Sequence, residues 1–302
     1  MGKNTVGAHR IYHVNINCSD LERSLAFYCD GIGLHKGGRT KPDAPQGGAA
    51  FGLEQVQWDA WILHGERGNE GVVLDLLEWQ VPRPQGEPRR RATDIGFSRL
   101  TIVVPDLAST HARLVAMGAD CWTEPTVVPL TPPTKMFIVG DPDGTQIELI
   151  EGPEVRLSHV AINCADLDRS QRFYENSMGL TMVLDIETPP LPGSVFRLEG
   201  DVRLHARLMR DAATGFMVEL ISWVVPSPTK WGFRKANDLG IFRMAWLTDD
   251  IDRDYYALLR AGACCYTPPA TLEMGPGISP VRALFFDDPD AVCLEIVESG
   301  TR

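Results

Sequence analysis

The sequence predicts an α+β protein built from four βαβββ modules. Residues 13–34, HVNINCSDLERSLAFYCDGIGL, recur at 159–180 as HVAINCADLDRSQRFYENSMGL, in one register and without a gap. In both copies a stretch that alternates like a strand leads into apolar residues at helical spacing. A weaker copy of the same plan follows each of them. The chain is therefore duplicated, and its function should be read from what the copies keep and lose.

The composition is that of an ordinary globular chain. It has 302 residues, of which 44% are hydrophobic, which suits about two domains. The net charge of -11 argues against nucleic acid or an anionic membrane as a partner, since both require a basic face. No apolar run approaches the roughly 18 residues that span a bilayer. We expect a cytoplasmic protein whose seven cysteines are reduced thiols.

The first module can be followed element by element. Residues 11–18 alternate between polar and apolar side chains, as in a half-buried strand. Ser19 begins a capping-box signature, which predicts a helix that ends by Gly33. Apolar residues at 60–63 and 72–79 predict two further strands. The module thus reads β-α-β-β-β.

The second module follows a linker rich in proline and arginine at 82–93. A strand is predicted at 98–104, and Asp106 is the expected cap of a helix that stops at Gly118. An Asp-Pro-Asp-Gly turn then leads into a strand at 145–150. The second module repeats the plan of the first.

The third and fourth modules repeat this pair. The third ends in Trp-Val-Val-Pro, as the first ends in Trp-Gln-Val-Pro. The fourth has a predicted helix at 251–261 and a last strand at 292–297. The four modules are expected at residues 10–80, 95–150, 156–224 and 240–298. Because the linkers are short, we expect sequential neighbours to pair, giving domains at 10–152 and 156–299.

These motifs resemble one known family. They are a strand beginning with His, a capped helix ending in Phe-Tyr and Gly-Leu, and a DPDG turn before an Ile-Glu-Leu strand. The pattern, over about residues 10–298, is similar to the vicinal oxygen chelate (VOC) superfamily, which includes glyoxalase I, bleomycin-resistance proteins and extradiol dioxygenases. The resemblance implies that paired modules curl into two half-barrels. It also implies a divalent metal in each floor, held by the first and last strands. It does not name a reaction.

Eight residues fall at these floor positions. The first-strand positions are His13, Arg99, His159 and Arg243, and the last-strand positions are Asp75, Glu148, Glu219 and Glu295. The resemblance implies catalytic roles for His13, Glu148, His159 and Glu295. It implies possible metal ligation by His13, Asp75, Glu148, His159, Glu219 and Glu295. The two arginines depart from the family pattern and are candidates for substrate contact or ion pairing.

Three pairings of the modules are conceivable. Sequential pairing should bring His13 and Glu148 together across one floor, while exchange would pair module 1 with 4 and module 2 with 3. Both leave one His, one Arg and two carboxylates in each floor. Only a pairing of modules 1 and 3 would gather both histidines, as in a glyoxalase-like ligand set.

The arginines leave the cofactor open. A guanidinium cannot ligate a metal or lose its charge, and it can occupy both carboxylates of a floor by pairing with them. One His and two carboxylates remain a ligand set for Fe, Mn, Ni or Zn. One divalent metal per floor and no metal at all are both retained as expectations.

Two classes of function follow. The first is a glyoxalase-like enzyme on a small oxygenated molecule, with lyase, isomerase or ring-modifying chemistry. The alternative is a metal-free protein that binds a small molecule or antibiotic. An extradiol dioxygenase is disfavoured, because its metal site would need His at Arg243. The expected partner is a small molecule, with a homodimer as a further possibility.

Other conspicuous residues have structural explanations. Phe27-Tyr28 and Phe173-Tyr174 are predicted core residues, and His64 and His205 lie in strands of uncertain register. The cysteines that recur in pairs are predicted to be small packing residues. They are Cys18, Cys121, Cys164 and Cys265.

Overall fold

A computed structural model describes residues 6–88, 91–128, 133–229 and 235–298 of the chain. Its strands in module 1 are β1 (Arg10–Asn17), β2 (His35–Thr40), β3 (Gln46–Gly47), β4 (Gln55–His64) and β5 (Val73–Val81). Module 2 has β6 (Gly96–Val104), β7 (Asp120–Cys121), β8 (Thr126–Val128), β9 (Thr134–Gly140) and β10 (Gln146–Glu151). Module 3 has β11 (Arg156–Asn163), β12 (Thr181–Glu187), β13 (Leu191–Pro192), β14 (Asp201–Arg210) and β15 (Met217–Val225). Module 4 has β16 (Gly240–Thr248), β17 (Cys264–Cys265), β18 (Ala270–Leu272), β19 (Val281–Asp287) and β20 (Cys293–Glu298).

The helices separate the first and second main strands of each module. They are α1 (Leu21–Leu25), α2 (Leu107–Ala116), α3 (Leu167–Asn176) and α4 (Ile251–Ala261). A π-helical segment, η1 (Ala26–Ile32), continues α1. Short 3-10 turns are η2 (Ala49–Phe51), η3 (Gly68–Glu70) and η4 (Gly193–Phe196). The predicted α+β class and its four modules are confirmed.

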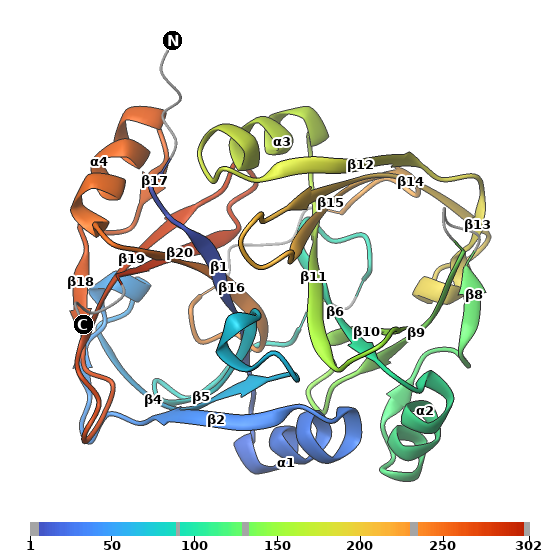
Figure 1. Cartoon of the computed structure of the whole chain (residues 1–302), viewed down its shortest axis with the longest axis horizontal. Helices are drawn as coiled ribbons and strands as arrows, with labels where there is room; N and C mark the ends of the chain where they lie inside the picture. Colours follow the sequence, from blue (N-terminus) through green and yellow to red (C-terminus); the bar gives the residue numbers. More distant parts are fainter. Residues whose placement is uncertain (1–5, 89–90, 129–132, 230–234, 299–302) are drawn as a thin grey trace.

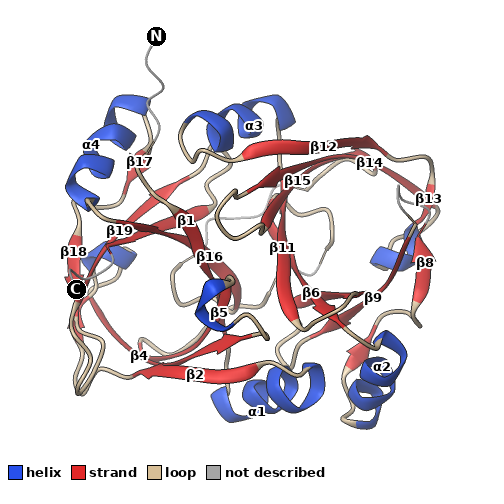
Figure 2. Cartoon of the chain, in the orientation of Figure 1, coloured by secondary structure: helices blue, strands red, loops and turns tan. Residues whose placement is uncertain are grey.

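The strands form two mixed sheets of ten strands each, which curve side by side (Figure 1). The main path of the first is β17-β19-β20-β16-β1-β5-β4-β2, with β18 paired to β19 and β3 to β4. The main path of the second is β12-β14-β15-β11-β6-β10-β9-β7, with β13 paired to β14 and β8 to β9. The helices α1 to α4 lie on the outside of the sheets (Figure 2).

The expected sequential pairing is wrong. β1 of module 1 pairs antiparallel with β16 of module 4, and β11 of module 3 pairs with β6 of module 2. Each sheet therefore takes one module from residues 10–152 and one from residues 156–299, which is the exchanged arrangement. We call the two resulting half-barrels the 1–4 barrel and the 2–3 barrel.

Two repeated asparagines hold the linkers in this arrangement. Asn17 Nδ2 donates to the carbonyls of Ala236 and Asp238, at 2.7 and 2.8 Å, in the linker that precedes module 4. Asn17 Oδ1 accepts from Trp79 Nε1 at 3.1 Å. Asn163 is the equivalent residue of module 3. These bonds hold the linker before module 4 against β1 of module 1, the strand with which β16 of module 4 pairs.

Asn163 repeats the contacts of Asn17 in the 2–3 barrel. Its Nδ2 donates to the carbonyls of Ala92 and Asp94, at 2.6 and 2.8 Å, in the linker that precedes module 2. Trp223 Nε1 donates to Asn163 Oδ1 at 3.0 Å. Short linkers thus connect modules of different sheets, which explains why linker length misled the prediction.

The helix caps show one further difference from expectation. Asp20, not Ser19, caps α1, since its side chain accepts from the amide of Arg23. Ser19 instead donates from its amide and hydroxyl to Asp143 of module 2, at 2.8 and 2.5 Å. Asp106 caps α2 as predicted, by accepting from the amide of Ser109. The capping-box motif is local, so it could not reveal the contact of Ser19 with Asp143, which lies 124 residues away in the chain.

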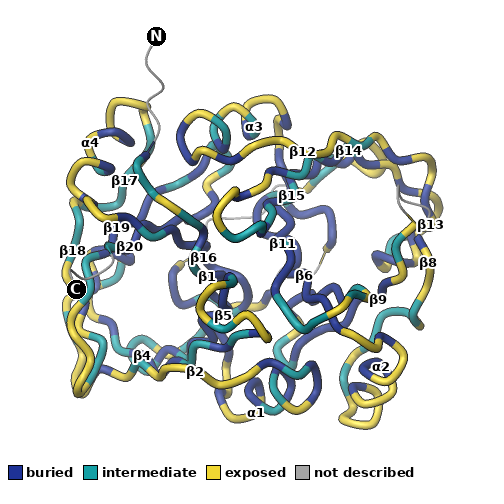
Figure 3. Tube along the Cα trace, viewed as in Figure 1, coloured by how far each residue is buried: buried dark blue, intermediate teal, exposed yellow. Residues whose placement is uncertain are grey.

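The core has three clusters. The largest includes Tyr28 and Tyr174, both with 0% exposure, as predicted for core residues. Two smaller clusters lie at the floors, one around Trp79 and one around Trp223. The strands at the centre of the molecule are buried, whereas the outer faces of the helices are exposed (Figure 3). Among the described residues no helix is long and apolar enough to cross a membrane.

Candidate functional site

Four neighbouring strands build the floor of the 1–4 barrel. β20, β16, β1 and β5 lie in that order in the sheet. Asn15 stands opposite Arg243 on one side and Asp75 on the other, while Glu295 is paired with Ala245, which is also the partner of His13. The sheet register therefore gathers the 1–4 floor, which consists of His13, Asp75, Arg243 and Glu295.

Arg243 is the centre of this floor. Its Nε donates to Glu295 Oε2 at 2.7 Å and its Nη2 to Asp75 Oδ2 at 2.8 Å. His13 Nε2 lies 3.1 Å from Glu295 Oε2 and 4.0 Å from Asp75 Oδ2. The guanidinium also lies about 6 Å from the rings of Phe51, Phe242 and Phe285, which is within reach of a cation–π attraction. The four polar side chains are all buried.

The charges of the floor are set by this pairing. Burial raises the pKa of Glu295, but Arg243 and the hydrogen bond of His13 outweigh burial, so that its pKa lies below the usual value. The two carboxylates raise the pKa of Arg243 against the effect of burial. Glu295 is therefore a carboxylate and Arg243 a guanidinium at neutral pH. With a neutral His13, the floor carries a net charge of -1.

A cavity of about 330 Å³ opens above the 1–4 floor. Its size falls at the lower end of the range of small-molecule sites. Most of its walls are apolar or aromatic. Its lining includes Tyr12, Phe51, Trp58, Leu272, Met274 and Glu298. A concave, largely apolar space above a few polar groups is the usual form of a small-molecule site.

The 2–3 barrel repeats the same floor. Arg99 Nε donates to Glu148 Oε2 at 2.6 Å, and its Nη2 donates to Glu219 Oε2 at 2.7 Å. His159 Nε2 lies 3.7 Å from Glu148 and 3.9 Å from Glu219, so it is less closely paired than His13. Thr101 donates a further bond to Glu148 at 3.3 Å. We call Arg99, Glu148, His159 and Glu219 the 2–3 floor.

Burial has the largest effect on the pKa of His159, the imidazole of the 2–3 floor. It lowers the pKa of His159, an effect that Arg99 reinforces and that Glu219 and Glu148 oppose. Burial raises the pKa of Glu148, but Arg99 and His159 bring it below the usual value. His159 is therefore a neutral imidazole beside an ionised carboxylate.

The structure thus regroups the predicted site residues. His13 does not approach Glu148, which belongs to the other barrel, and its neighbour is Glu295. Glu148 lies instead beside His159. His64 and His205 stand outside both floors, with His64 bonded to the carbonyl of Gly65 and His205 to Asp185.

The expected divalent metal does not fit these floors. Arg243 donates to Glu295 Oε2 and Asp75 Oδ2, which are the carboxylate oxygens that face His13. A divalent ion about 4 Å from the guanidinium would be repelled by roughly 8 kcal/mol at an effective dielectric of about 20. Among the residues that the structure describes, no group of three His, Cys, Asp or Glu is arranged to hold a metal. The arginine supplies the positive charge that the carboxylates need.

Sequence reasoning missed two buried tyrosine–aspartate pairs. Tyr28 donates to Asp141 at 2.9 Å, and Tyr174 donates to Asp288 at 3.1 Å. Burial raises the pKa of Asp141 to about 6 and that of Asp288 to about 7. The signal was present, since each Tyr closes a repeated Phe-Tyr and each Asp opens a repeated Asp-Pro-Asp. These pairs join the two barrels and lie apart from the floors.

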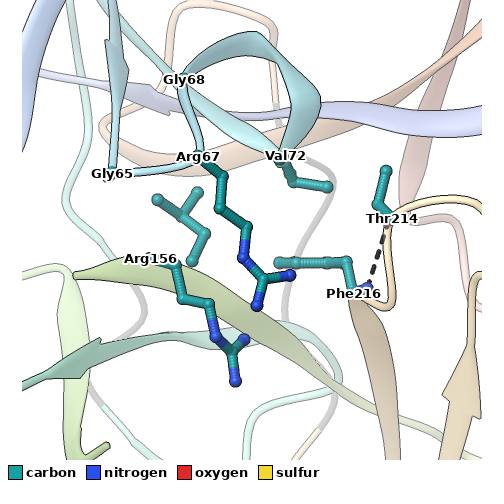
Figure 4. Close-up of a pocket in the computed structure, with 9 residues that line it drawn as sticks. Gly65, Arg67, Gly68, Val72, Arg156, Thr214 and Phe216 are labelled. Atoms are coloured by element: carbon teal, nitrogen blue, oxygen red, sulfur yellow. Dashed lines mark hydrogen bonds between the residues drawn. The ribbon is translucent and has the colours of Figure 1, made fainter. Parts of the chain in front are cut away.

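A second hollow lies where modules 1 and 3 meet (Figure 4). Its cavity of about 10 Å³ has room for about one water molecule. Arg67 and Arg156 line it, and Glu154 lies 2.5 Å from Arg67 and 3.7 Å from Arg156. It is too small for an organic substrate.

Comparison with known proteins places the whole chain in one family. The model of the Glyoxalase/Bleomycin resistance protein/Dioxygenase superfamily matches residues 10–149 and 156–296. Among solved structures, glyoxalase I from Zea mays is similar over 96% of this chain and 92% of its own, with a TM-score of 0.68 and 19% identity. A putative dioxygenase from Bacillus subtilis covers 98% of this chain and 87% of its own, with a TM-score of 0.61 and 17% identity. At these identities the likeness concerns the fold alone.

Sequence relatives carry one recurrent name. A probable chloroplastic lactoylglutathione lyase of Arabidopsis thaliana is 27% identical over 60% of this chain and 47% of its own length. The lactoylglutathione lyase GLX1 of the same plant is 28% identical over 60% of this chain and 58% of its length. The chain thus spans about half the length of these relatives. A probable lactoylglutathione lyase of Synechocystis is 29% identical over 47% of this chain and 94% of its own.

Proposed function

Because the chain belongs to the Glyoxalase/Bleomycin resistance protein/Dioxygenase superfamily, we propose that it is a glyoxalase-like enzyme that transfers a proton without a metal. Its substrate would be a small oxygenated molecule held in the cavity of the 1–4 barrel. The observation that carries the proposal is the hydrogen bond between His13 and Glu295, 3.1 Å long, at the floor of that cavity. An imidazole oriented by a carboxylate is a common arrangement for a general base.

The protonation of Glu295 decides which imidazole atom is the base. Since this carboxylate is ionised, it accepts, and His13 Nε2 carries the donating hydrogen. The free lone pair of His13 is then on Nδ1, which is buried and has no hydrogen-bond partner among the described residues, so the imidazole must turn toward the cavity for Nδ1 to reach a substrate. When Nδ1 takes up a proton, Glu295 and Asp75 stabilise the imidazolium that forms.

Tyr12 provides a donor for the substrate oxygen. It lines the cavity, and burial together with the charge of Asp75 raises its pKa, so that the phenol stays protonated. In the proposed reaction, His13 removes a proton from a carbon next to a carbonyl group. Tyr12 donates a hydrogen bond to the oxygen that becomes negative, and His13 returns the proton at a neighbouring atom. This sequence serves an isomerase.

A binding protein is the second candidate. It is favoured by the pairing of both floor carboxylates with Arg243, which places a buried ion-pair cluster beneath apolar walls. Such a cluster could be structural, with the cavity binding a drug or metabolite without changing it.

Hydrogen exchange separates the two candidates. Incubation in D₂O with a panel of neutral aryl and alkyl α-hydroxyketones, followed by NMR, should show catalysed uptake of deuterium next to the carbonyl group. His13→Gln should reduce this exchange by about a hundredfold or more, in line with the usual contribution of a general base. His159→Gln is the matched control in the other barrel, and a chelator should have no effect. Ligand binding without exchange would support the binding protein instead.

A further inference from the structure

We infer that the cavity of the 1–4 barrel accepts an uncharged or cationic molecule with a largely apolar body, and rejects anions. This inference concerns the same site as the proposed function and rests on it to that extent. It specifies the chemical class of the substrate. It also departs from the names of the relatives, because a glutathione adduct carries a net negative charge.

The formal charges that face the cavity are the first argument. Among the described lining residues, Asp75, Glu295 and Glu298 are acidic, and Arg243 is basic. Three carboxylates and one guanidinium give a formal charge of -2 when His13 is neutral. Arg243 makes its close contacts with two of these carboxylates, at 2.7 and 2.8 Å, so its charge is locally cancelled. An anionic ligand would meet an excess of negative charge in a low-dielectric cavity.

Two nearby cations, Arg39 in β2 and Lys41 just after it, do not change this balance. Thr40 lines the cavity, and adjacent residues of an extended chain point to opposite faces, which turns Arg39 and Lys41 away. Both pair with Asp59, Arg39 Nη2 at 2.7 Å and Lys41 Nζ at 2.7 Å. Arg39 also lies 5.6 Å from the centre of the Trp61 ring, which does not line the cavity.

The cation on β19 is similarly engaged. Val281 lines the cavity, and Arg282 follows it in the strand. Arg282 pairs with Asp252 at 2.7 Å and with Glu298 at 3.2 Å. It offsets part of the charge of Glu298 but offers no free guanidinium to a ligand.

The chemistry of the lining specifies the ligand further. Ionised carboxylates only accept hydrogen bonds, so the ligand should present a hydroxyl or an ammonium group to the floor. The walls above, which include Phe51, Trp58, Leu272 and Met274, favour an apolar or aromatic body. The cavity thus suits a ring-bearing alcohol or amine.

Three probes of nearly equal shape test the inference. They are 1-naphthylmethylamine, 1-naphthylmethanol and 1-naphthoate, and their dissociation constants at pH 7.5 can be measured by calorimetry or NMR titration. The amine should bind at least as tightly as the alcohol, and the carboxylate at least about tenfold more weakly. S-hexylglutathione should bind no better than the carboxylate.

Two variants locate the effect. Glu298→Gln keeps the shape of a lining side chain. It should weaken the binding of the amine several-fold and leave the binding of the alcohol unchanged. Met274→Trp should fill the cavity and weaken both. Tight binding of naphthoate or S-hexylglutathione, or an amine affinity that Glu298→Gln leaves unchanged, would overturn the inference. Failure of all probes to bind at millimolar concentration would contradict the cavity as a ligand site. None of these measurements depends on turnover, so the exchange experiment can fail independently.

Discussion

Arg243 Nη2 and Asp75 Oδ2 lie 2.8 Å apart, although 168 residues separate them in the chain. Arg243 belongs to module 4 and Asp75 to module 1, so this ion pair exists only because the modules exchange partners. The equivalent pair in the other barrel is Arg99 and Glu219, at 2.7 Å. A buried arginine between two carboxylates is therefore a feature that both barrels have in common.

Replacement of Arg243 by Met should destabilise the fold. Asp75 and Glu295 would remain as two buried and unopposed carboxylates, and breaking a buried ion pair typically costs about 3–5 kcal/mol. Urea denaturation at pH 7.5 measures the loss. Arg39→Met, which breaks an ion pair of a partly exposed arginine, should cost much less. Equal unfolding free energies for Arg243→Met and the wild type would show that water screens the 1–4 floor.

A histidine in place of either floor arginine should create a metal site. Arg243→His and Arg99→His remove the repelling charge and add a neutral imidazole to one His and two carboxylates, a set that suits first-row divalent ions. Calorimetric titration with Zn²⁺ or Mn²⁺ after dialysis against chelator should show much tighter binding than in the wild type. Arg243→Met, which removes the charge without adding a ligand, is the control.

Either of two results would argue against this view of the floors. Stoichiometric metal in the wild type, lost on His13→Ala or His159→Ala, would show that arginine does not exclude it. Metal-free histidine variants would mean that the floor side chains do not converge tightly enough to form a site.

The contribution of Asp288 to the stability of the protein should fall as the pH rises from about 5 to 7. The pKa of Asp288 is raised to about 7, so the folded chain holds a proton that the unfolded chain has released above its ordinary value of 3.8. The stabilisation is complete below pH 4 and is lost as the pH approaches 7. Urea unfolding between pH 5 and 8 should show this slope in the wild type and a smaller one in Asp288→Asn.

The floor glutamates have the opposite linkage. Because their pKa values are lowered, Glu148 and Glu295 stabilise the fold above their ordinary value of 4.5, and this contribution is lost only in more acidic solution. His159 acts in the same range with the opposite sign, because its lowered pKa makes the fold more stable as the pH rises toward 6.5. The difference in slope between the wild type and Asp288→Asn therefore isolates the aspartate. Asp43→Asn, at an exposed position, should leave that slope unchanged. An equally steep slope in Asp288→Asn would refute the assignment.

Asn17→Ala should loosen the linker that leads into module 4. The substitution removes the bonds to the carbonyls of Ala236 and Asp238 and leaves the indole nitrogen of Trp79 without its acceptor. Each buried polar group that loses its partner costs about 1–3 kcal/mol. Urea denaturation should show a loss of this order or larger, and a similar loss for Asn163→Ala.

The exposed Asn69→Ala serves as the control for the asparagine variants and should unfold like the wild type. Faster hydrogen exchange in β16 of Asn17→Ala would connect the loss to the pairing of β1 with β16. Unchanged stability in both asparagine variants would mean that the linkers keep their positions without these side chains.

The sequence by itself determined the repeated parts of the protein. Alternation, helical spacing and turn residues are local properties, so the four modules, the helix at 251–261 and the composition of each floor could be read from it. The residues at the floor positions are one His, one Arg and two carboxylates under either sequential or exchanged pairing. For that reason the residue types of each floor could be predicted without knowing whether sequential or exchanged modules pair.

Only the tertiary structure decided the partners. A free strand edge offers the same backbone donors and acceptors to any neighbour, so nothing in β1 itself distinguishes β6 from β16. The choice depends on contacts between distant segments, such as Asn17 with the linker at Ala236 and Asp238, and Ser19 with Asp143. The same long-range packing placed Glu295, not Glu148, beside His13. The burial that shifts the pKa values of the floor residues likewise arises only when the barrels close.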